Sequence, residues 1–331
     1  MLTFTFLGTS SGVPTRHRNV SGLAVQSAAG AGWLLVDVGE GTQQRLLQTR
    51  LSLHDLEAIC ITHVHGDHCY GLPGLLASAG MAGRKRPLTL IAPRPVWDWL
   101  AATRACTDLH LPYEVAHVDV AAAPSPVWTA SGLRVDAHAL RHRVPSYAYR
   151  VETVAQRIQL DVNALHAAGL PPGPMWKALQ SGEDVSCDGR VLHSAAFTTR
   201  TTQRACAVIG GDNAEPALLR EACEGAQLLV HEATYTQSIL DKVGPGPMHS
   251  AAGQVATFAQ SAGLPNLVLT HFSARYQAAA GLAELEAEAR AQYTTGALWL
   301  ANDLDVFELD AAGVLSRRTL TQRVAATPFH P

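Results

Sequence analysis

Short apolar runs, bounded by glycine, proline or polar residues, recur along the chain. Residues 2–7 alternate between apolar and polar side chains, and Ala58 to Ile61 form a continuous apolar run typical of a strand buried on both faces. Further strands are predicted at 23–26, 33–37, 88–92, 115–120, 133–139, 206–209, 228–230, 267–270 and 297–309. The residues 28–32, rich in glycine and alanine, predict a hairpin between the first two of these.

Segments with helical spacing separate many of the strands. They are predicted at 44–49, 72–81, 96–103, 161–168, 175–180, 214–223 and 251–263. Strands that alternate with helices predict the α/β class, in which helices cover the faces of the sheets. Residues 152–190 differ, because glycine and proline interrupt them and they offer little core-forming material. We interpret this segment as an excursion from the main body, with a surface insertion of no function as the alternative.

The strongest chemical signal follows the apolar run at 58–61. Four potential metal ligands, His63, His65, Asp67 and His68, fall within six residues. His63 and His65 alternate as on an extended segment, so both can face one way, while Asp67 and His68 lie past the turn at Gly66. Because the two pairs of side chains would point in different directions, they indicate two metal ions. Zinc binds such a mixture of histidine and aspartate ligands. The alternative is a surface cluster of histidines.

Polar residues of the metal-binding types also end three later strands. Asp212 follows one apolar run, Glu232 ends the next, and His271 follows the third. Three such residues in succession argue for one shared site at the edge of a sheet. A third ligand for one ion could be His142 or His138, and spacing does not choose between them. Asp37, at another strand end, either orients a ligand histidine or caps a turn.

Composition narrows the function. The chain has 331 residues, 47% of them hydrophobic, which is ample for a large core, and a net charge of −3 gives no global basic field. The six cysteines form no CxxC pair, and neither a signal peptide nor a membrane-spanning stretch is apparent. These features predict a cytoplasmic protein with reduced thiols and no membrane partner.

The segment from His63 to His68 resembles the HxHxDH signature of the metallo-β-lactamase superfamily. The whole chain is more similar to the bacterial ribonuclease Z family, the tRNA 3′-processing endonucleases. The matching segments, in the order of that family, are 6–19 with its Pro14–Asn19 loop, 37–43, 71–76, 171–174, 231–234, 249–250 and 270–276.

This resemblance implies an αββα sandwich of the metallo-β-lactamase fold. It implies one domain over residues 1–331, with a protruding tRNA-binding arm inserted at about 152–190. It also implies two zinc ions per subunit and makes His138 an ordinary strand residue. One ion would be bound by His63, His65 and His142, the other by Asp67, His68 and His271, with Asp212 bridging them.

The resemblance further implies a zinc-dependent endoribonuclease that removes the 3′ trailer from precursor tRNA. The products would be a tRNA with a 3′-hydroxyl and a trailer with a 5′-phosphate. Asp67 would accept a proton, and His249, with Glu232 beside it, would serve the leaving oxygen. Without the resemblance, His249 reads as a surface histidine at a helix start.

By the same resemblance, the protein would be a homodimer in which one subunit's arm serves the other's active site. The expected substrate contacts are Arg18, Asn19, Pro172, Gly173, Pro174 and Arg275. The chain departs from the family at Asn213, where threonine is usual, at Ala148, where glycine is usual, and in its arm, whose few cations are Arg157, Lys177 and Arg190.

Two other classes of function are compatible with the residues. One is a general zinc phosphodiesterase or another hydrolase of the same fold, which a panel of substrates would distinguish. The other is a non-catalytic RNA-binding relative, which assays of zinc content and cleavage would exclude.

Overall fold

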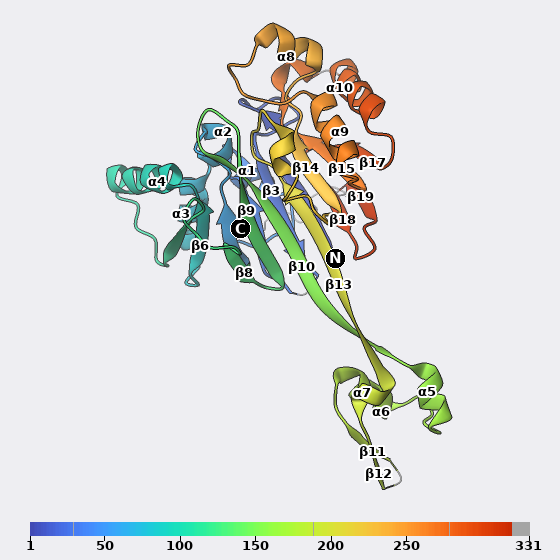
Figure 1. Ribbon diagram of the computed structural model, residues 1–331. Coiled ribbons are helices and arrows are strands. Elements are labelled where there is room, and N and C mark those ends of the chain that lie inside the picture. The colour runs from blue at the N-terminus through green and yellow to red at the C-terminus, as the bar shows by residue number, and fades with distance from the viewer. Residues whose placement is uncertain (29, 188, 278, 320–331) are drawn as a thin grey trace, which may run out of the picture. The chain divides into compact units, whose positions relative to one another are not determined.

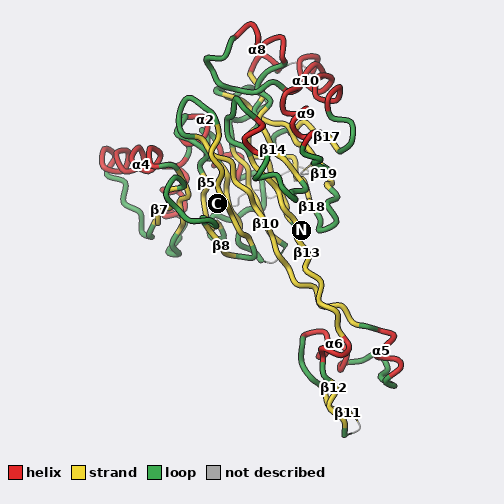
Figure 2. Tube along the Cα trace, in the orientation of Figure 1, coloured by secondary structure: helices red, strands yellow, loops and turns green. Residues whose placement is uncertain are grey.

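The computed structural model describes residues 1–28, 30–187, 189–277 and 279–319. The chain divides into two compact units, one formed by Met1–Thr153 and Ala205–Pro331 and the other by Val154–Arg204. The strands β10 (Ser146–Leu160) and β13 (Thr198–Ile209) continue from the first unit into the second (Figures 1 and 2).

Two β-sheets form the centre of the first unit. The larger has the order β19-β18-β1-β3-β4-β5-β6-β7 and the smaller the order β17-β15-β14-β13-β10-β9-β8. The strands of the larger sheet are β1 (Leu2–Gly8), β3 (Gly22–Ser27), β4 (Trp33–Val36), β5 (Leu56–Cys60), β6 (Leu88–Ala92), β7 (Val115–Asp119), β18 (Asp305–Leu309) and β19 (Leu315–Thr319). Besides β10 and β13, the smaller sheet contains β8 (Trp128–Ala130), β9 (Leu133–Leu140), β14 (Leu228–Glu232), β15 (Asn266–Thr270) and β17 (Ala297–Leu300).

Alternation of side chains along the strands produces three hydrophobic layers. On β4, Leu34 and Val36 join the cluster between the two sheets, whereas Trp33 and Leu35 join the cluster under the outer helices. The helices α3 (Leu72–Met81) and α4 (Arg94–Thr107) contribute to that outer cluster. On the other side, α9 (Ala252–Ser261) and α10 (Ala279–Gln292) pack with residues of the smaller sheet (Figure 1). The order helix, sheet, sheet, helix confirms the predicted αββα sandwich.

Both sheets contain a run of parallel strands. The strands β4 to β7 pair in parallel in the larger sheet, as do β13, β14, β15 and β17 in the smaller one. In such sheets, sites form in the loops at the carboxyl ends of the strands. The connecting elements near these ends are α1 (Thr42–Leu46), α2 (Gly66–Cys69), α8 (Gln237–Val243), the short strands β2 (Ser10–Ser11) and β16 (Phe272–Ser273), and the 3₁₀ turns η1 (Pro216–Leu219) and η2 (Ala274–Tyr276).

The second unit has a small core of its own. Leu165, Leu170 and Leu179 are buried there, and partly buried apolar side chains pack against them. Its elements are α5 (Val162–Ala167), α6 (Pro174–Ser181), β11 (Val185–Cys187), β12 (Arg190–Leu192) and α7 (Ser194–Phe197). The expectation of little core-forming material in this part of the chain is therefore wrong.

Two predicted elements of the first unit differ in the structure. The single strand expected at 297–309 is two strands, β17 and β18, which belong to different sheets. Between them Leu304 has a φ of 65°, and the carboxylate of Asp305 accepts the N–H of Asn302, so the chain turns. The helix expected at 214–223 is reduced to the 3₁₀ turn η1, because the side chain of Asn213 accepts the N–H of Glu215 and starts a turn there.

The other strands predicted in the first unit coincide with observed strands. The helices α8 and α10 were not predicted. Among the residues that the structure describes, no helix is long and apolar enough to cross a membrane.

Candidate metal centre

Four segments of the first unit bring potential ligands to one edge of the two sheets. The segment after β5 carries His63 and His65, and the loop between β9 and β10 carries His142. From the smaller sheet, Asp212 follows β13 and His271 follows β15. The strand-end positions expected from the sequence therefore converge, although these residues are far apart in the chain.

Three imidazoles and one carboxylate form the first ligand group. The Nδ1 atom of His65 lies 3.0 Å from Nε2 of His63 and 3.1 Å from Nε2 of His142. One oxygen of Asp212, Oδ2, lies 3.6 Å from Nε2 of His63 and 3.8 Å from Nε2 of His142. Burial lowers the pKa of all three histidines, so their neutral, metal-binding forms are favoured.

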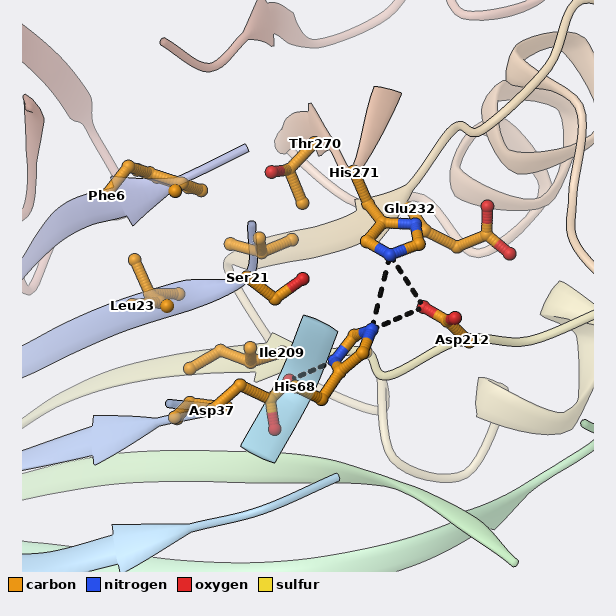
Figure 3. A pocket seen from close by; sticks show the side chains of 15 residues that line it. Phe6, Ser21, Leu23, Asp37, His68, Ile209, Asp212, Glu232, Thr270 and His271 are labelled. Atoms are coloured by element: carbon orange, nitrogen blue, oxygen red, sulfur yellow. Dashed lines mark hydrogen bonds and ion pairs between the residues drawn. The ribbon is translucent and has the colours of Figure 1, made fainter. Parts of the chain in front are cut away.

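The second ligand group contains Asp67, His68 and His271. The Nε2 atoms of the two histidines are 3.2 Å apart, and Oδ2 of Asp67 lies 3.6 Å from the first and 3.4 Å from the second. The other oxygen of Asp212, Oδ1, lies 3.4 Å from both imidazoles. Figure 3 shows the rings of His68 and His271 turned toward the Asp212 carboxylate.

Asp212 therefore faces both groups, one oxygen to each. It is buried, which by itself would raise the pKa of its carboxyl, but the charges of His271 and His68 hold that pKa well below its usual range. The carboxylate is ionised at neutral pH and suited to bridge two cations.

The geometry of the donors fits zinc. Zinc–nitrogen bonds of about 2.0–2.1 Å at tetrahedral angles place neighbouring donor atoms about 3.3 Å apart. The donor pairs measured above lie 3.0 to 3.8 Å apart, and the donor atoms of each group all lie within 4.8 Å of one another. A third set, Asp212, His249 and His271, meets the same limit, so His249 could also reach an ion.

Hydrogen bonds fix the far side of each imidazole. Asp37 accepts from Nδ1 of His68 at 2.7 Å, and the backbone N–H and hydroxyl of Thr62 also donate to Asp37. The hydroxyl oxygen of Thr234 lies 3.0 Å from Nδ1 of His271. Of the two roles left open for Asp37, orientation of a ligand histidine is the one the structure supports. Such partners set the tautomer and direction of a metal ligand.

Strained backbone also concentrates at this edge. Asp37, Met248 and His271 have φ angles of 61°, 58° and 58°, which residues other than glycine rarely adopt. Two of them contact or belong to the second ligand group, and Met248 precedes His249. Surrounding contacts must hold these conformations, which is typical of functional sites.

His249 and Glu232 form a pair beside the ligands. Nδ1 of His249 lies 3.2 Å from Oε1 of Glu232 and 3.7 Å from Oδ2 of Asp212. Burial alone would lower the pKa of His249, but the charge and hydrogen bond of Glu232 outweigh it and raise the pKa to about 9. Glu232 is itself held by the N–H groups of Thr234 and Ser250. The imidazole is thus held protonated at the edge of the centre.

Relatives of known family match most of this chain. A ribonuclease Z of Marinobacter nauticus is 49% identical over 93% of this chain and 96% of its own, and one of Pseudomonas putida is 47% identical over 95% and 98%. The chain belongs to the ribonuclease Z family. The class of activity expected from the sequence, a hydrolytic endoribonuclease of the tRNase Z type, is confirmed by these relatives.

Solved structures support the fold independently. The short form of human tRNase Z matches with a TM-score of 0.63 and 23% identity, over 92% of this chain and 98% of that one. The metallo-β-lactamase fold protein YhfI of Bacillus subtilis matches with a TM-score of 0.62 and 19% identity, over 96% and 99%. A family model described as Anti-Pycsar protein Apyc1 matches residues 2–104, a minority of the chain.

Asn213, where this ribonuclease Z relative departs from the family pattern, is a buried hub. Its side-chain oxygen accepts the N–H of Arg141, the residue before His142. Its amide nitrogen lies 3.2 Å from Nε2 of His231, and its carbonyl accepts the hydroxyl of Ser250. Neither this role nor that of Thr234 could be predicted from the sequence, because their partners are distant in the chain.

The expected substrate contacts lie in different surroundings. Arg18 and Asn19 are buried within the first unit, and their exposed fractions are 7% and 8%. Arg275 is exposed, and its guanidinium lies 5.3 Å from the ring of Tyr235. The centre of that ring lies 5.9 Å from the centre of the His249 ring. The remaining three, Pro172, Gly173 and Pro174, are exposed in the second unit before and at the start of α6. Their contacts with RNA stay a prediction.

The carboxylate of Asp37 generates a test of the centre. Asp37→Ala removes the acceptor for His68 and is expected to lower zinc affinity about 10–100-fold, as measured by competition with a chelator. Asp108→Ala is the matched control, because Asp108 shares the left-handed backbone but is exposed and belongs to none of the ligand groups. Unchanged zinc affinity in Asp37→Ala would show that His68 needs no orientation.

Proposed function

We propose that this ribonuclease Z relative removes the 3′ trailer from precursor tRNA at a centre that holds two zinc ions. The observation that carries the proposal is the pair of ligand groups that share Asp212. The first ion would be held by His63, His65 and His142, and the second by Asp67, His68 and His271. When bound, such ions make a nucleophile available from water at neutral pH and neutralise phosphoryl oxygens.

The side chains around the centre would handle the protons. Asp67 has an ionised carboxylate, because the charges of His68 and His271 outweigh burial and lower its pKa. It is our candidate for accepting the proton of the attacking water. His249, held protonated by Glu232, would donate to the leaving 3′ oxygen of the tRNA. This leaves a 3′-hydroxyl on the tRNA and a 5′-phosphate on the trailer.

RNA recognition would lie outside the ligand groups. We propose that the second unit, including Pro172, Gly173 and Pro174, binds tRNA by shape and phosphate position, since it carries exposed Lys177 and Arg190. Arg275, beside Tyr235, is proposed to contact a phosphate near the cleaved bond. We also propose a cytoplasmic location, which the buried thiols of Cys60, Cys69 and Cys223 support, because none of them forms a disulfide.

His249→Ala tests the proton donor. It is expected to lower kcat for precursor tRNA by roughly 10²–10⁴-fold, the usual contribution of such a group. Elemental analysis is expected to find about two zinc ions per chain in both the wild type and this variant, as in other two-metal sites. Near-normal cleavage would remove the role of His249 as an acid, and loss of one zinc would make it a ligand. Glu232→Gln is the matched partner variant, expected to lower kcat less.

The role of the second unit can be tested by removing it. Replacing Val154–Arg204 with a short Gly-Ser linker is expected to abolish cleavage of precursor tRNA but to spare bis(p-nitrophenyl) phosphate, because every proposed ligand lies in the first unit. The readout is kcat/KM on both substrates. An equal loss on the two substrates would mean that the unit is structural.

A homodimer is the proposed assembly, and exposed apolar side chains support it. Leu47 on the segment after α1 and Met81 at the end of α3 are 81% and 82% exposed. A hydrogen bond from Gln43 to Ser78 ties these two elements together. We propose that a second copy packs on this face, because it would bury these two large apolar side chains.

Met81→Glu is therefore expected to give a monomer by light scattering. Val314→Glu changes another exposed apolar residue and should leave the assembly unchanged. A wild-type monomer at micromolar concentration would contradict the dimer.

A further inference from the structure

The loop after β1 lies against the second ligand group. Its residues Ser10 and Ser11 form β2, which pairs in parallel with Phe272 and Ser273 of β16. The strand β16 begins directly after His271, so this pairing holds the backbone on which His271 is carried. The N–H of Phe272 also donates to the carbonyl of Thr9.

The same loop contacts Asp67. The backbone N–H of Gly12 donates to Oδ2 of Asp67 at 2.7 Å, the oxygen that also faces His271. Gly12 has a φ of 71°, a conformation that glycine adopts readily. The loop therefore fixes two members of the second ligand group, one through strand pairing and the other through this hydrogen bond.

The side chain of Arg18 fastens this loop to the body of the first unit. Its guanidinium donates to the hydroxyl of Thr9 at 2.6 Å, to the carbonyl of Ala301 at 2.7 Å and to the side chain of Asn302 at 2.7 Å. It also lies over the ring of Phe272, 5.0 Å from the ring centre. Three of its five N–H donors are engaged within the protein, and the side chain is buried.

Asp303 fastens the loop through the same threonine. Its carboxylate accepts the hydroxyl of Thr9 at 2.7 Å and the N–H of Asn19 at 2.6 Å. Arg45 pairs with the carboxylate at 3.3 Å. Arg18, Thr9 and Asp303 thus form one buried polar network, and removal of any member leaves the others with unsatisfied groups.

We propose that Arg18 is a positioning residue for the second metal ion and not a contact for RNA. It acts through the loop on Asp67 and His271. The proposal rests on the two-zinc centre proposed above, but it assigns Arg18 to the metal site where the family resemblance assigns it to the substrate.

The two roles differ in what they change. A contact with RNA contributes to binding of the large substrate, so its loss raises KM for precursor tRNA and leaves a small phosphodiester unaffected. A positioning role alters the centre itself, so its loss lowers kcat on both substrates and weakens zinc binding. The buried hydroxyl of Thr9 separates them further, because it is 1% exposed and cannot touch RNA.

The experiment compares Arg18→Ala, Arg18→Lys and Thr9→Val with the wild type. Zinc affinity is measured by competition with a chelator, and kcat and KM are measured on precursor tRNA and on bis(p-nitrophenyl) phosphate. Arg18→Ala and Thr9→Val are expected to bind the weaker zinc about tenfold less tightly, as for other groups that orient ligands. Both should lose kcat on the two substrates with little change in KM.

Arg18→Lys should recover part of the loss, because an ammonium can replace one of the three hydrogen bonds. Arg16→Ala is the matched control, since it removes an exposed guanidinium from the same loop and should bind zinc like the wild type.

A different pattern would overturn the proposal. If Arg18→Ala binds two zinc ions as tightly as the wild type and changes KM for precursor tRNA alone, Arg18 contacts RNA. Wild-type behaviour of Thr9→Val would contradict the network as well, even where Arg18→Ala fails to fold. Absence of zinc from the wild type would instead contradict the proposed metal centre, so the two failures are distinguishable.

Discussion

The buried carboxylate of Asp212 is the constraint on which the rest of the centre depends. An ionised carboxylate among apolar strands is strongly unfavourable unless charges and hydrogen bonds compensate for the lost water. Here the imidazoles of His63, His68 and His271 supply that compensation from two different sheets. The end of β13 therefore determines where the segment after β5 and the end of β15 must lie. Assembly of the ligands consequently depends on the packing of the two sheets.

A second set of contacts fixes the orientation of the ligand rings around Asp212. Asp37 lies behind His68, Thr234 behind His271, and the carbonyl of Met248 behind His142. Each contact leaves one ring nitrogen free to face the shared carboxylate. The partners come from other strands or loops than the ligands they orient, so a shift between strands would move a ligand and its support apart. The fold thereby orients the ligand rings through contacts that do not involve a metal.

The sequence was informative where the relevant contacts are local. The apolar runs located β4 and β14 because these strands are buried on both faces, and the spacing of His63 to His68 indicated two directions without any structure. The choice of His142 over His138 came from the family resemblance, and the structure has His138 on β9, outside the ligand groups of the described residues.

What the sequence could not indicate depends on long-range contacts. Asp37 and His68 are 31 residues apart, and Arg18 and Ala301 are 283 apart. Apolar periodicity says nothing about such pairs. The same limit explains the segment at 297–309, since an apolar run is compatible with one strand or with two strands in facing sheets.

The seven proposed ligands lie in two parts of the chain, and this division limits what the match to the Apyc1 family model means. The part that the Apyc1 family model matches, residues 2–104, contains His63, His65, Asp67 and His68. His142, Asp212 and His271 lie beyond it, so the matched part alone completes neither ligand group. The match to the Apyc1 family model therefore covers only four of the seven proposed ligands. The features proposed to act on RNA, which are His249 with Glu232 and the second unit, also lie beyond residue 104. Because each ligand group draws on residues from both sides of residue 104, the match to that family model cannot by itself carry the chemistry of the proposed centre.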